Sequence, residues 1–182
     1  MASKANGSGG GPVPWRLIGW AIPVVLLTIP WLNRWPWTGS DFIVAGAMFA
    51  IVGGSFELAI RASGNFSYRL GAAAALATAF LLTWINLAVG IIGNENNPLN
   101  LMFFGVIGIA LIGSLIARFR AGGMALALTI AASFQALIGI AVVALDWGTS
   151  EPPGAFGLFV LIEGFAFLWL VSAWLFRKAA RA

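Results

Sequence analysis

Two of the six acidic residues lie inside long apolar stretches, where a carboxyl group indicates either a function or a specific partner. Glu163 stands within residues 155–176 and Glu57 within residues 41–60. A charged side chain in a lipid-facing segment is costly, so ionisable residues there usually face a bundle interior and bind ions, relay protons or pair with one another. The chain has no Cys and no His. Any proton chemistry would therefore have to use these carboxyl groups.

Glu163 is the stronger candidate of the two. A helical rise of about 1.5 Å per residue places it about 12 Å inside its apolar stretch, close to the membrane midplane. Counted from the opposite surface, Gln135, Thr83 and Thr28 reach a similar depth, and Asn86 follows Thr83 in the same stretch. The sequence thus predicts a polar site of four residues, namely Glu163, Gln135, Thr83 and Asn86. Such a site either passes protons or cations or joins helices through a neutral carboxyl group.

Glu57 lies four residues before Arg61, the spacing at which side chains on one helix face meet. Two interpretations are open. The residues form either a local ion pair, with the Arg61 side chain extending toward the membrane surface, or part of a cytoplasmic gate.

The composition assigns the chain to the membrane proteins. Apolar residues make up 60%, charged residues 9%, and the mean hydropathy is +0.95, which is outside the range of soluble domains. The net charge of +4 comes without a basic stripe interleaved with aromatic residues, so nucleic acid is not an expected partner. Because Cys and His are missing, we expect no metal site, haem or other cofactor.

Six apolar stretches are each close to the length that crosses the ~30 Å hydrocarbon core of a bilayer. We therefore predict an all-α, polytopic membrane helix bundle over residues 15–178, preceded by a flexible cytoplasmic tail, residues 1–14, that is rich in Gly and Ser. The predicted transmembrane helices cover residues 15–32, 41–60, 70–93, 99–117, 123–145 and 155–176.

The positive charges predict the orientation of these helices. Nine of the ten Lys and Arg residues lie in alternate gaps between the stretches, and only Arg34 departs from the pattern. Because cytoplasmic loops carry an excess of Lys and Arg, both termini are predicted to be cytoplasmic. Trp31, Trp35 and Trp147 fall near predicted helix ends, as in an aromatic belt.

A faint internal repeat links the second and fourth predicted helices. Residues 46–61 align without gaps with residues 105–120, and the helices that follow continue the similarity. The repeat of hairpins 2–3 and 4–5 would be parallel, with a pseudo-twofold axis along the membrane normal; chance similarity of Gly- and Ala-rich helices is the alternative. Small residues at four-residue spacing predict close packing of the second to fifth helices. The bulkier first and last helices are expected at the periphery.

Residues 94–100, NENNPLN, connect the third and fourth predicted helices. Their oxygen-rich side chains suggest a calcium site, but the acidic spacing of a calcium loop is missing. We expect instead a turn in which Asn97 or Asn100 caps a helix.

Residues 84–120, WINLAVGIIGNENNPLNLMFFGVIGIALIGSLIARFR, resemble uncharacterised small six-span inner-membrane proteins of proteobacteria. The resemblance covers about a fifth of the chain. It implies a multi-pass protein of the bacterial inner (cytoplasmic) membrane, and it implies no activity.

Two functions are compatible with these residues. The first is a small permease or channel-like protein for protons or a small solute, in which the four polar residues converge. The second is a non-catalytic structural or assembly subunit of a larger inner-membrane complex, or a homo-oligomer, in which Glu163 is clamped by a neighbouring helix. An enzyme is not expected, because two carboxyl groups at different depths on distant helices make a poor acid–base pair.

Overall fold

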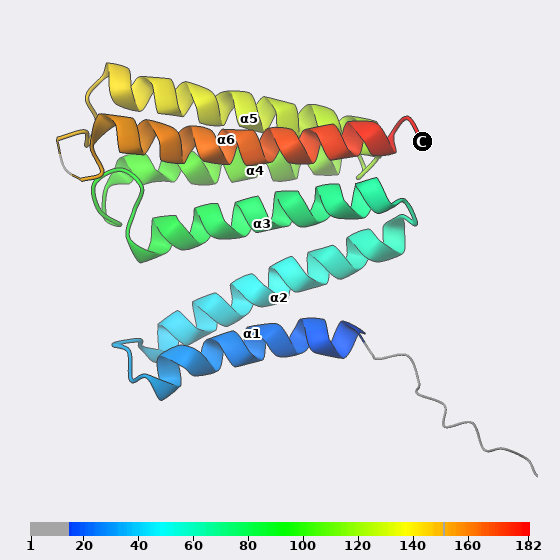
Figure 1. The fold of residues 1–182 in the computed structure, drawn as a ribbon, viewed down its shortest axis with the longest axis horizontal. Helices are drawn as coiled ribbons and strands as arrows, with labels where there is room; N and C mark the ends of the chain where they lie inside the picture. Colours follow the sequence, from blue (N-terminus) through cyan, green and yellow to red (C-terminus); the bar gives the residue numbers. More distant parts are fainter. Residues whose placement is uncertain (1–14, 151) are drawn as a thin grey trace, which may run out of the picture. The chain divides into compact units, whose positions relative to one another are not determined.

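The computed structural model describes residues 15–150 and 152–182, so the predicted tail, residues 1–14, lies outside the described residues. Within this range the chain is helical and contains no strand (Figure 1). The helices are α1 (Trp15–Leu32), α2 (Gly39–Ala62), α3 (Phe66–Ala88), a 3₁₀ turn η1 (Pro98–Asn100), α4 (Leu101–Ile116), α5 (Ala121–Ala144) and α6 (Gly154–Ala179).

Five of these helices, α2 to α6, are long and apolar enough to cross a membrane, with η1 extending α4. The prediction of an all-α membrane protein is confirmed to that extent. Over the range in which its side chains are described, α1 is a shorter apolar helix, Leu17–Leu32. The sixth crossing therefore stays a prediction.

The chain divides into two compact units, of which the first ends at Gly53 and the second spans Gly54–Ala182. In the first unit, the ring of Trp20 on α1 packs against Gly53 on α2, where an added Cβ would lie 3.1 Å from the ring. A glycine at this position lets the two helices approach closely.

Four helices form the core of the second unit. α6 packs most extensively against α5 and also against α3, while α5 packs against α4 as well. Contacts between α3 and α4 are few, so the order of packed neighbours is α4, α5, α6, α3. Figure 1 shows α6 running between α5 and α3 and antiparallel to both.

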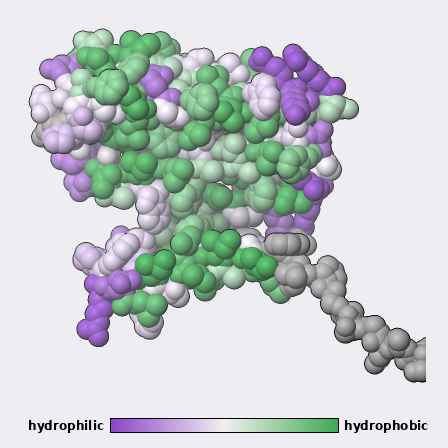
Figure 2. Space-filling view, viewed as in Figure 1, coloured by the Kyte–Doolittle hydropathy of each residue, from purple (hydrophilic) through white to green (hydrophobic). Residues whose placement is uncertain are grey.

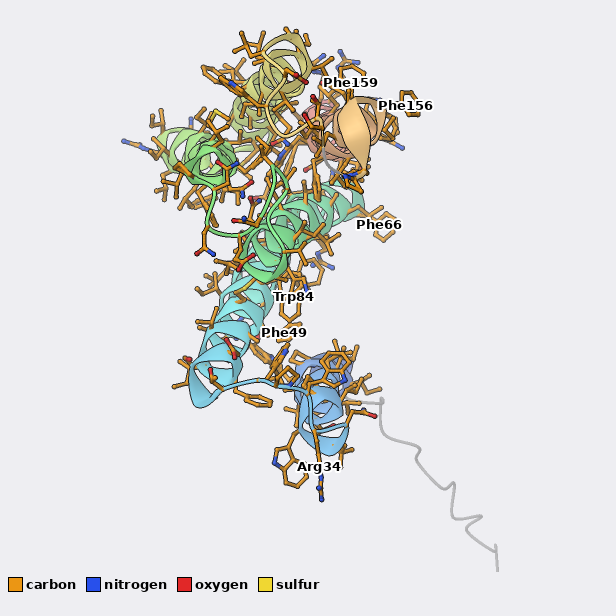
Figure 3. All side chains as sticks on the ribbon, turned by 90° about the vertical axis from the view of Figure 1, so that its left-hand side faces the viewer. Arg34, Phe49, Phe66, Trp84, Phe156 and Phe159 are labelled. Atoms are coloured by element: carbon orange, nitrogen blue, oxygen red, sulfur yellow. The ribbon has the colours of Figure 1, made fainter. Side chains whose placement is uncertain are left out.

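This arrangement corrects the expectation that the last helix is peripheral. Phe165, Trp169 and Phe176 of α6 are buried, and they are spaced four and seven residues apart, one and two helical turns, so they face the core from one side of the helix. Phe156 of the same helix is 82% exposed, and Figure 3 shows it pointing away from the bundle, as does Phe66 of α3. Bulky residues thus occupy both faces of α6, and only their periodicity distinguishes the buried face.

The surface of the second unit fits an apolar environment. Figure 2 shows apolar side chains over the middle of its helices and hydrophilic side chains gathered at their two ends. That distribution is expected of helices that cross a bilayer, whose polar residues are confined to the interfaces.

The third helix differs from its prediction at both ends. It begins at Phe66 rather than at residue 70, because the side chain of Asn65 caps it by accepting a 3.1 Å hydrogen bond from the Tyr68 amide. It ends at Ala88 rather than at residue 93, because Gly90 and Gly93 adopt φ values of 74° and 67°. Left-handed glycines commonly end helices.

Asn100 organises the loop that follows α3. Its buried side chain accepts hydrogen bonds from the amides of Ile91 at 3.1 Å and Ile92 at 2.9 Å, and both isoleucines are buried. Asn97 caps η1 by accepting a 3.0 Å bond from the Leu99 amide. The predicted capping turn is confirmed. Among the described residues, no group of three or more His, Cys, Asp or Glu side chains could hold a metal ion.

Candidate functional site

Glu163 lies near the middle of the 26-residue helix α6. The residue is partly buried, and its Oε1 atom is fully enclosed. Oε1 lies directly against Gly139 on α5, where an added Cβ would collide with it. The carboxyl group thus faces a neighbouring helix, at a position where glycine leaves room for it.

Gln135 lies one turn before Gly139 on the same face of α5. Its side chain is 0% exposed, and neither Oε1 nor Nε2 has a hydrogen-bond partner in the part of the chain that the structure describes. A primary amide offers two donors and an acceptor oxygen. Burying such a group without partners is rare and costly.

Trp169 on α6 joins this site, and the sequence analysis missed it. Its side chain is 1% exposed, and its indole Nε1 is buried without a partner. Glu163 on α6 lies opposite Gly139 on α5. From this contact, Trp169 lies about 9 Å farther along α6. Gln135 lies about 6 Å from Gly139 in the same direction, because α5 and α6 are antiparallel. Trp169 and Gln135 therefore lie in nearly the same layer of the bundle. The three-to-four-residue spacing of the bulky side chains of α6 could have revealed it.

Asn86 and Thr83 lie on α3. The Asn86 side chain is 3% exposed; its Nδ2 donates a 2.7 Å hydrogen bond to the backbone oxygen of Leu82, and its Oδ1 is buried without a partner. Thr83 is partly buried and lies three residues earlier, on a neighbouring part of the helix surface.

A hydrogen bond between α3 and α6 fixes their register. The Ser172 hydroxyl donates to the backbone oxygen of Gly71 at 2.7 Å. Counted from this bond, Glu163 lies about 13 Å along α6 and Thr83 about 18 Å along α3 in the same direction. Asn86 follows one turn later.

The four predicted residues therefore occupy successive depths rather than one cluster. Gln135 lies about one turn from Glu163 on one side, and Thr83 and Asn86 lie on the other. In the described part of the chain no hydrogen bond joins any two of them. Most of them have a buried polar atom that lacks a hydrogen-bond partner there. The five buried side-chain atoms that lack one, among the described residues, are Asn86 Oδ1, Gln135 Oε1 and Nε2, Glu163 Oε1 and Trp169 Nε1.

Glu57 and Arg61 lie in the part of α2 that belongs to the second unit. Arg61 Nη2 donates to Glu57 Oε1 at 2.8 Å, and the two side chains are 65% and 23% exposed, respectively. An exposed helix pair of this spacing typically contributes about 0.3–0.5 kcal/mol.

The chain matches no protein-family model, no curated protein and no solved structure.

Proposed function

We propose that the chain is a small permease or channel-like protein that passes protons or a small solute through the second unit, using the carboxyl group of Glu163. One observation carries the proposal. Of the five buried atoms without partners in the described residues, four belong to Glu163, Gln135 and Asn86, which the sequence had singled out. Each such atom costs about 1–3 kcal/mol, so an apolar side chain would be cheaper at each position. The presence of these polar atoms is explained if water or a solute forms hydrogen bonds with them.

The order of these residues along the bundle supports passage from one end toward the other. Gln135 and Trp169 share one layer, Glu163 lies about one turn away, and Thr83 and Asn86 lie beyond it. Measured along the helix axes, successive members of this series are offset by about one helical turn. The carboxyl group is the member of the series that can release and rebind a proton, and the others can orient the water between them.

A second candidate function is supported by a different observation. The contact between Glu163 Oε1 and Gly139 is what a residue that joins helices would make. Together with the exposed aromatic face of α6, on which Phe156, Phe167 and Trp174 lie, it is compatible with a structural or assembly subunit of a larger membrane complex, or with a homo-oligomer.

The proposed topology has six transmembrane helices, α1 included, with both termini in the cytoplasm of a bacterium. It is supported by the basic residues at alternate gaps and by the apolar helices. Because the chain has no Cys, single cysteines can be introduced without further changes. An impermeant maleimide applied to intact cells should label Asn96→Cys and should leave Gly64→Cys unlabelled. The opposite pattern would reverse the topology.

The parallel repeat of the α2–α3 and α4–α5 hairpins also remains a proposal. It is supported by the packing of α6 against both α3 and α5, the second helix of each hairpin. The aligned glycines differ in their surroundings, however. A Cβ on Gly113 would collide with the Cβ of Ala127, whereas a Cβ on Gly54 would have no atom within 4 Å.

Flux measurements in liposomes test the transport function. The wild type and Glu163→Gln are purified in mild detergent, reconstituted and compared for proton and cation flux, with Glu95→Gln in the α3–α4 loop as the matched control. We expect Glu163→Gln to abolish flux and Glu95→Gln to retain it, with both proteins folded. If no variant conducts, and proteins that copurify with the wild type dissociate from Glu163→Gln, the subunit function is correct instead.

A further inference from the structure

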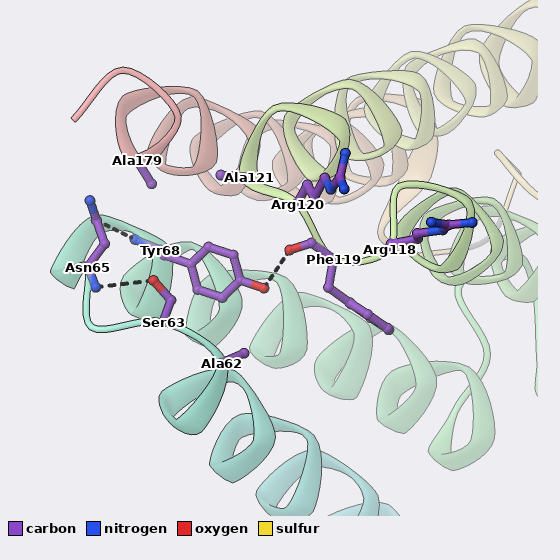
Figure 4. Close-up of a pocket in the computed structure, with 9 residues that line it drawn as sticks. All are labelled: Ala62, Ser63, Asn65, Tyr68, Arg118, Phe119, Arg120, Ala121 and Ala179. Carbon is purple, nitrogen blue, oxygen red and sulfur yellow. Dashed lines mark hydrogen bonds between the residues drawn. The ribbon is translucent and has the colours of Figure 1, made fainter.

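A pocket of about 380 Å³ opens at one end of the second unit, where the α2–α3 turn, the α4–α5 turn and the last turn of α6 meet (Figure 4). We call this end the basic end. The polar residues that line the pocket are Ser63, Asn65, Tyr68, Arg118 and Arg120. The proposed transport function does not use any of them.

The α2–α3 wall of the pocket is held in place by hydrogen bonds. The Ser63 side-chain oxygen accepts a 3.1 Å bond from the Asn65 amide, and the Asn65 side-chain oxygen accepts one from the Tyr68 amide. Arg69 donates to the backbone oxygens of Ser63 at 2.8 Å and Ile60 at 3.1 Å. This turn is therefore fixed before any ligand arrives.

The α4–α5 wall is held by the Tyr68 hydroxyl, which donates a 2.9 Å bond to the backbone oxygen of Phe119. Arg118 and Phe119 have φ values of 50° and 57°, a left-handed conformation that is unfavourable for residues other than glycine. α5 then begins at Ala121, and no side chain caps it. The Tyr68 bond thus holds an unfavourable turn in place beside the pocket.

Most of the hydrogen-bonding groups left for a ligand are donors, while the Tyr68 hydroxyl, whose hydrogen goes to Phe119, can only accept. The acceptor atoms of Ser63, Asn65 and Phe119 already receive the bonds described above. The Ser63 hydroxyl and the Asn65 Nδ2 group retain hydrogens to donate, and the guanidinium groups of Arg118 and Arg120 carry donors only. Both arginines are exposed, their side chains extend outward from the rim in Figure 4, and within the described residues no hydrogen bond or ion pair holds them.

The basic end is positively charged, which favours the same kind of ligand as these donors do, namely an anion. The cationic side chains at this end are Arg61, Arg69, Arg118, Arg120, Arg177, Lys178 and Arg181. In the described residues the acidic side chain at this end is Glu57, which is already paired with Arg61. An anion in the pocket would therefore meet net positive charge and no competing carboxylate side chain.

We propose that this pocket binds the phosphate of an anionic lipid headgroup. The pocket lies at the end of apolar helices, the level at which lipid phosphates lie, and basic pockets between helices at that level favour anionic headgroups. Phe66 and Ile116 are 73% and 78% exposed beside the two turns, where they can contact an acyl chain. Bidentate donation from an arginine suits a phosphate better than a single positive charge does.

Lipid retention measured by native mass spectrometry tests this proposal. The full chain is purified in mild detergent and equilibrated with equal amounts of phosphatidylglycerol and phosphatidylcholine. The pocket variant is Arg118→Gln/Arg120→Gln. The matched control is Arg177→Gln/Arg181→Gln, which removes the same charge from the basic end without changing the lining. A third variant, Arg118→Lys/Arg120→Lys, keeps the charge and loses the planar donor groups.

We expect the wild type and the control to prefer phosphatidylglycerol, and the pocket variant to bind it at least about tenfold more weakly than the control, from the loss of charge-assisted hydrogen bonds to the phosphate. The lysine variant should fall between them. A second arm adds inorganic phosphate. If phosphate alone displaces the lipid and binds as tightly, the anion site is correct and its ligand is a soluble phosphate. Equal loss in the pocket variant and the control, or no preference between the two lipids, would overturn the proposal.

Discussion

The Ser172 hydroxyl on α6 donates to the backbone oxygen of Gly71 on α3, and the 2.7 Å bond joins residues 101 positions apart. The Phe176 ring lies against the same glycine, 3.0 Å from where a Cβ would be. A helix contact in a membrane depends on such close backbone approach and on polar bonds, since burial from water contributes little there. This region therefore adds a polar bond and a close backbone contact to the packing of α3 against α6.

Ser172→Ala removes that hydrogen bond and leaves the packing intact. We expect the folded state to lose about 0.6–1 kcal/mol, the usual contribution of an interhelical bond in a membrane protein. Unfolding in mixed micelles measures the change. Ser133→Ala is the control, because the exposed Ser133 hydroxyl donates to the backbone oxygen of Thr129 on its own helix. Equal effects of the two substitutions would show that the α3–α6 bond contributes nothing of its own.

Gly139→Ala should destabilise the protein by about 1–3 kcal/mol through overpacking. The added methyl group would collide with Glu163 Oε1 and would lie 3.2 Å from a methyl carbon of Ile162. Combining the substitution with Glu163→Ala should recover most of the loss, which a double-mutant cycle measures. Gly105→Ala is the control, because an added Cβ there meets no atom within 4 Å. Additive effects at residues 139 and 163 would contradict the contact.

Gln135→Leu should leave the stability unchanged or raise it, while flux falls. The substitution replaces two buried polar atoms that have no partner by apolar groups of similar size, which removes a desolvation penalty. Stability in mixed micelles and flux in liposomes are measured on the same preparation. A loss of more than about 1 kcal/mol would mean that the amide has a stabilising partner after all. Phe134→Leu, one residue away at an exposed position, controls for general disturbance of α5.

Asn100→Ala should be the most damaging substitution in the α3–α4 loop. It leaves the buried amides of Ile91 and Ile92 without an acceptor, at about 1–3 kcal/mol for each group that stays unsatisfied. Hydrogen exchange of residues 89–100 should accelerate together with the drop in stability. Asn96→Ala removes an exposed side chain of the same type and should change neither quantity. Similar exchange in both variants would contradict the role of Asn100.

Tyr68→Phe tests the α4–α5 turn. Loss of the hydroxyl removes the bond to Phe119, and we expect faster hydrogen exchange over residues 117–121 and a loss of about 1 kcal/mol. Ring packing against Phe176, with centroids 5.0 Å apart, is kept in the variant. Unchanged exchange in the turn would show that its left-handed residues are held by other contacts.

The number and type of the helices follow directly from apolar length, because a bilayer sets that length. The error at α3 arose where apolar composition continued past the helix end. Ile91 and Ile92 are as apolar as a helix interior requires, but the glycines on either side of them turn the chain, and Asn100 holds the turn from eight or nine residues away. A long-range bond of that kind leaves no periodic trace in the sequence.

The candidate site was predictable in part. Glu163, Gln135 and Asn86 are conspicuous as polar residues in apolar stretches, and each has a buried atom without a partner. Trp169 was missed because tryptophan is common in these helices and its single polar atom does not mark it as a site residue. The basic-end pocket was missed for another reason. Its lining comes from three separate segments, and only the fold brings them together.

The central place of α6 has a consequence for biosynthesis. This helix is the last of the six to leave the ribosome, yet it is the neighbour that α3 and α5 share. Until α6 inserts, Gln135 and the backbone at Gly71 and Gly139 lack this neighbouring helix. The interior of the second unit is incomplete until then. A chain that stops before Gly154 therefore lacks the helix that packs against both α3 and α5, and leaves the Gly139 face of α5 without that neighbour.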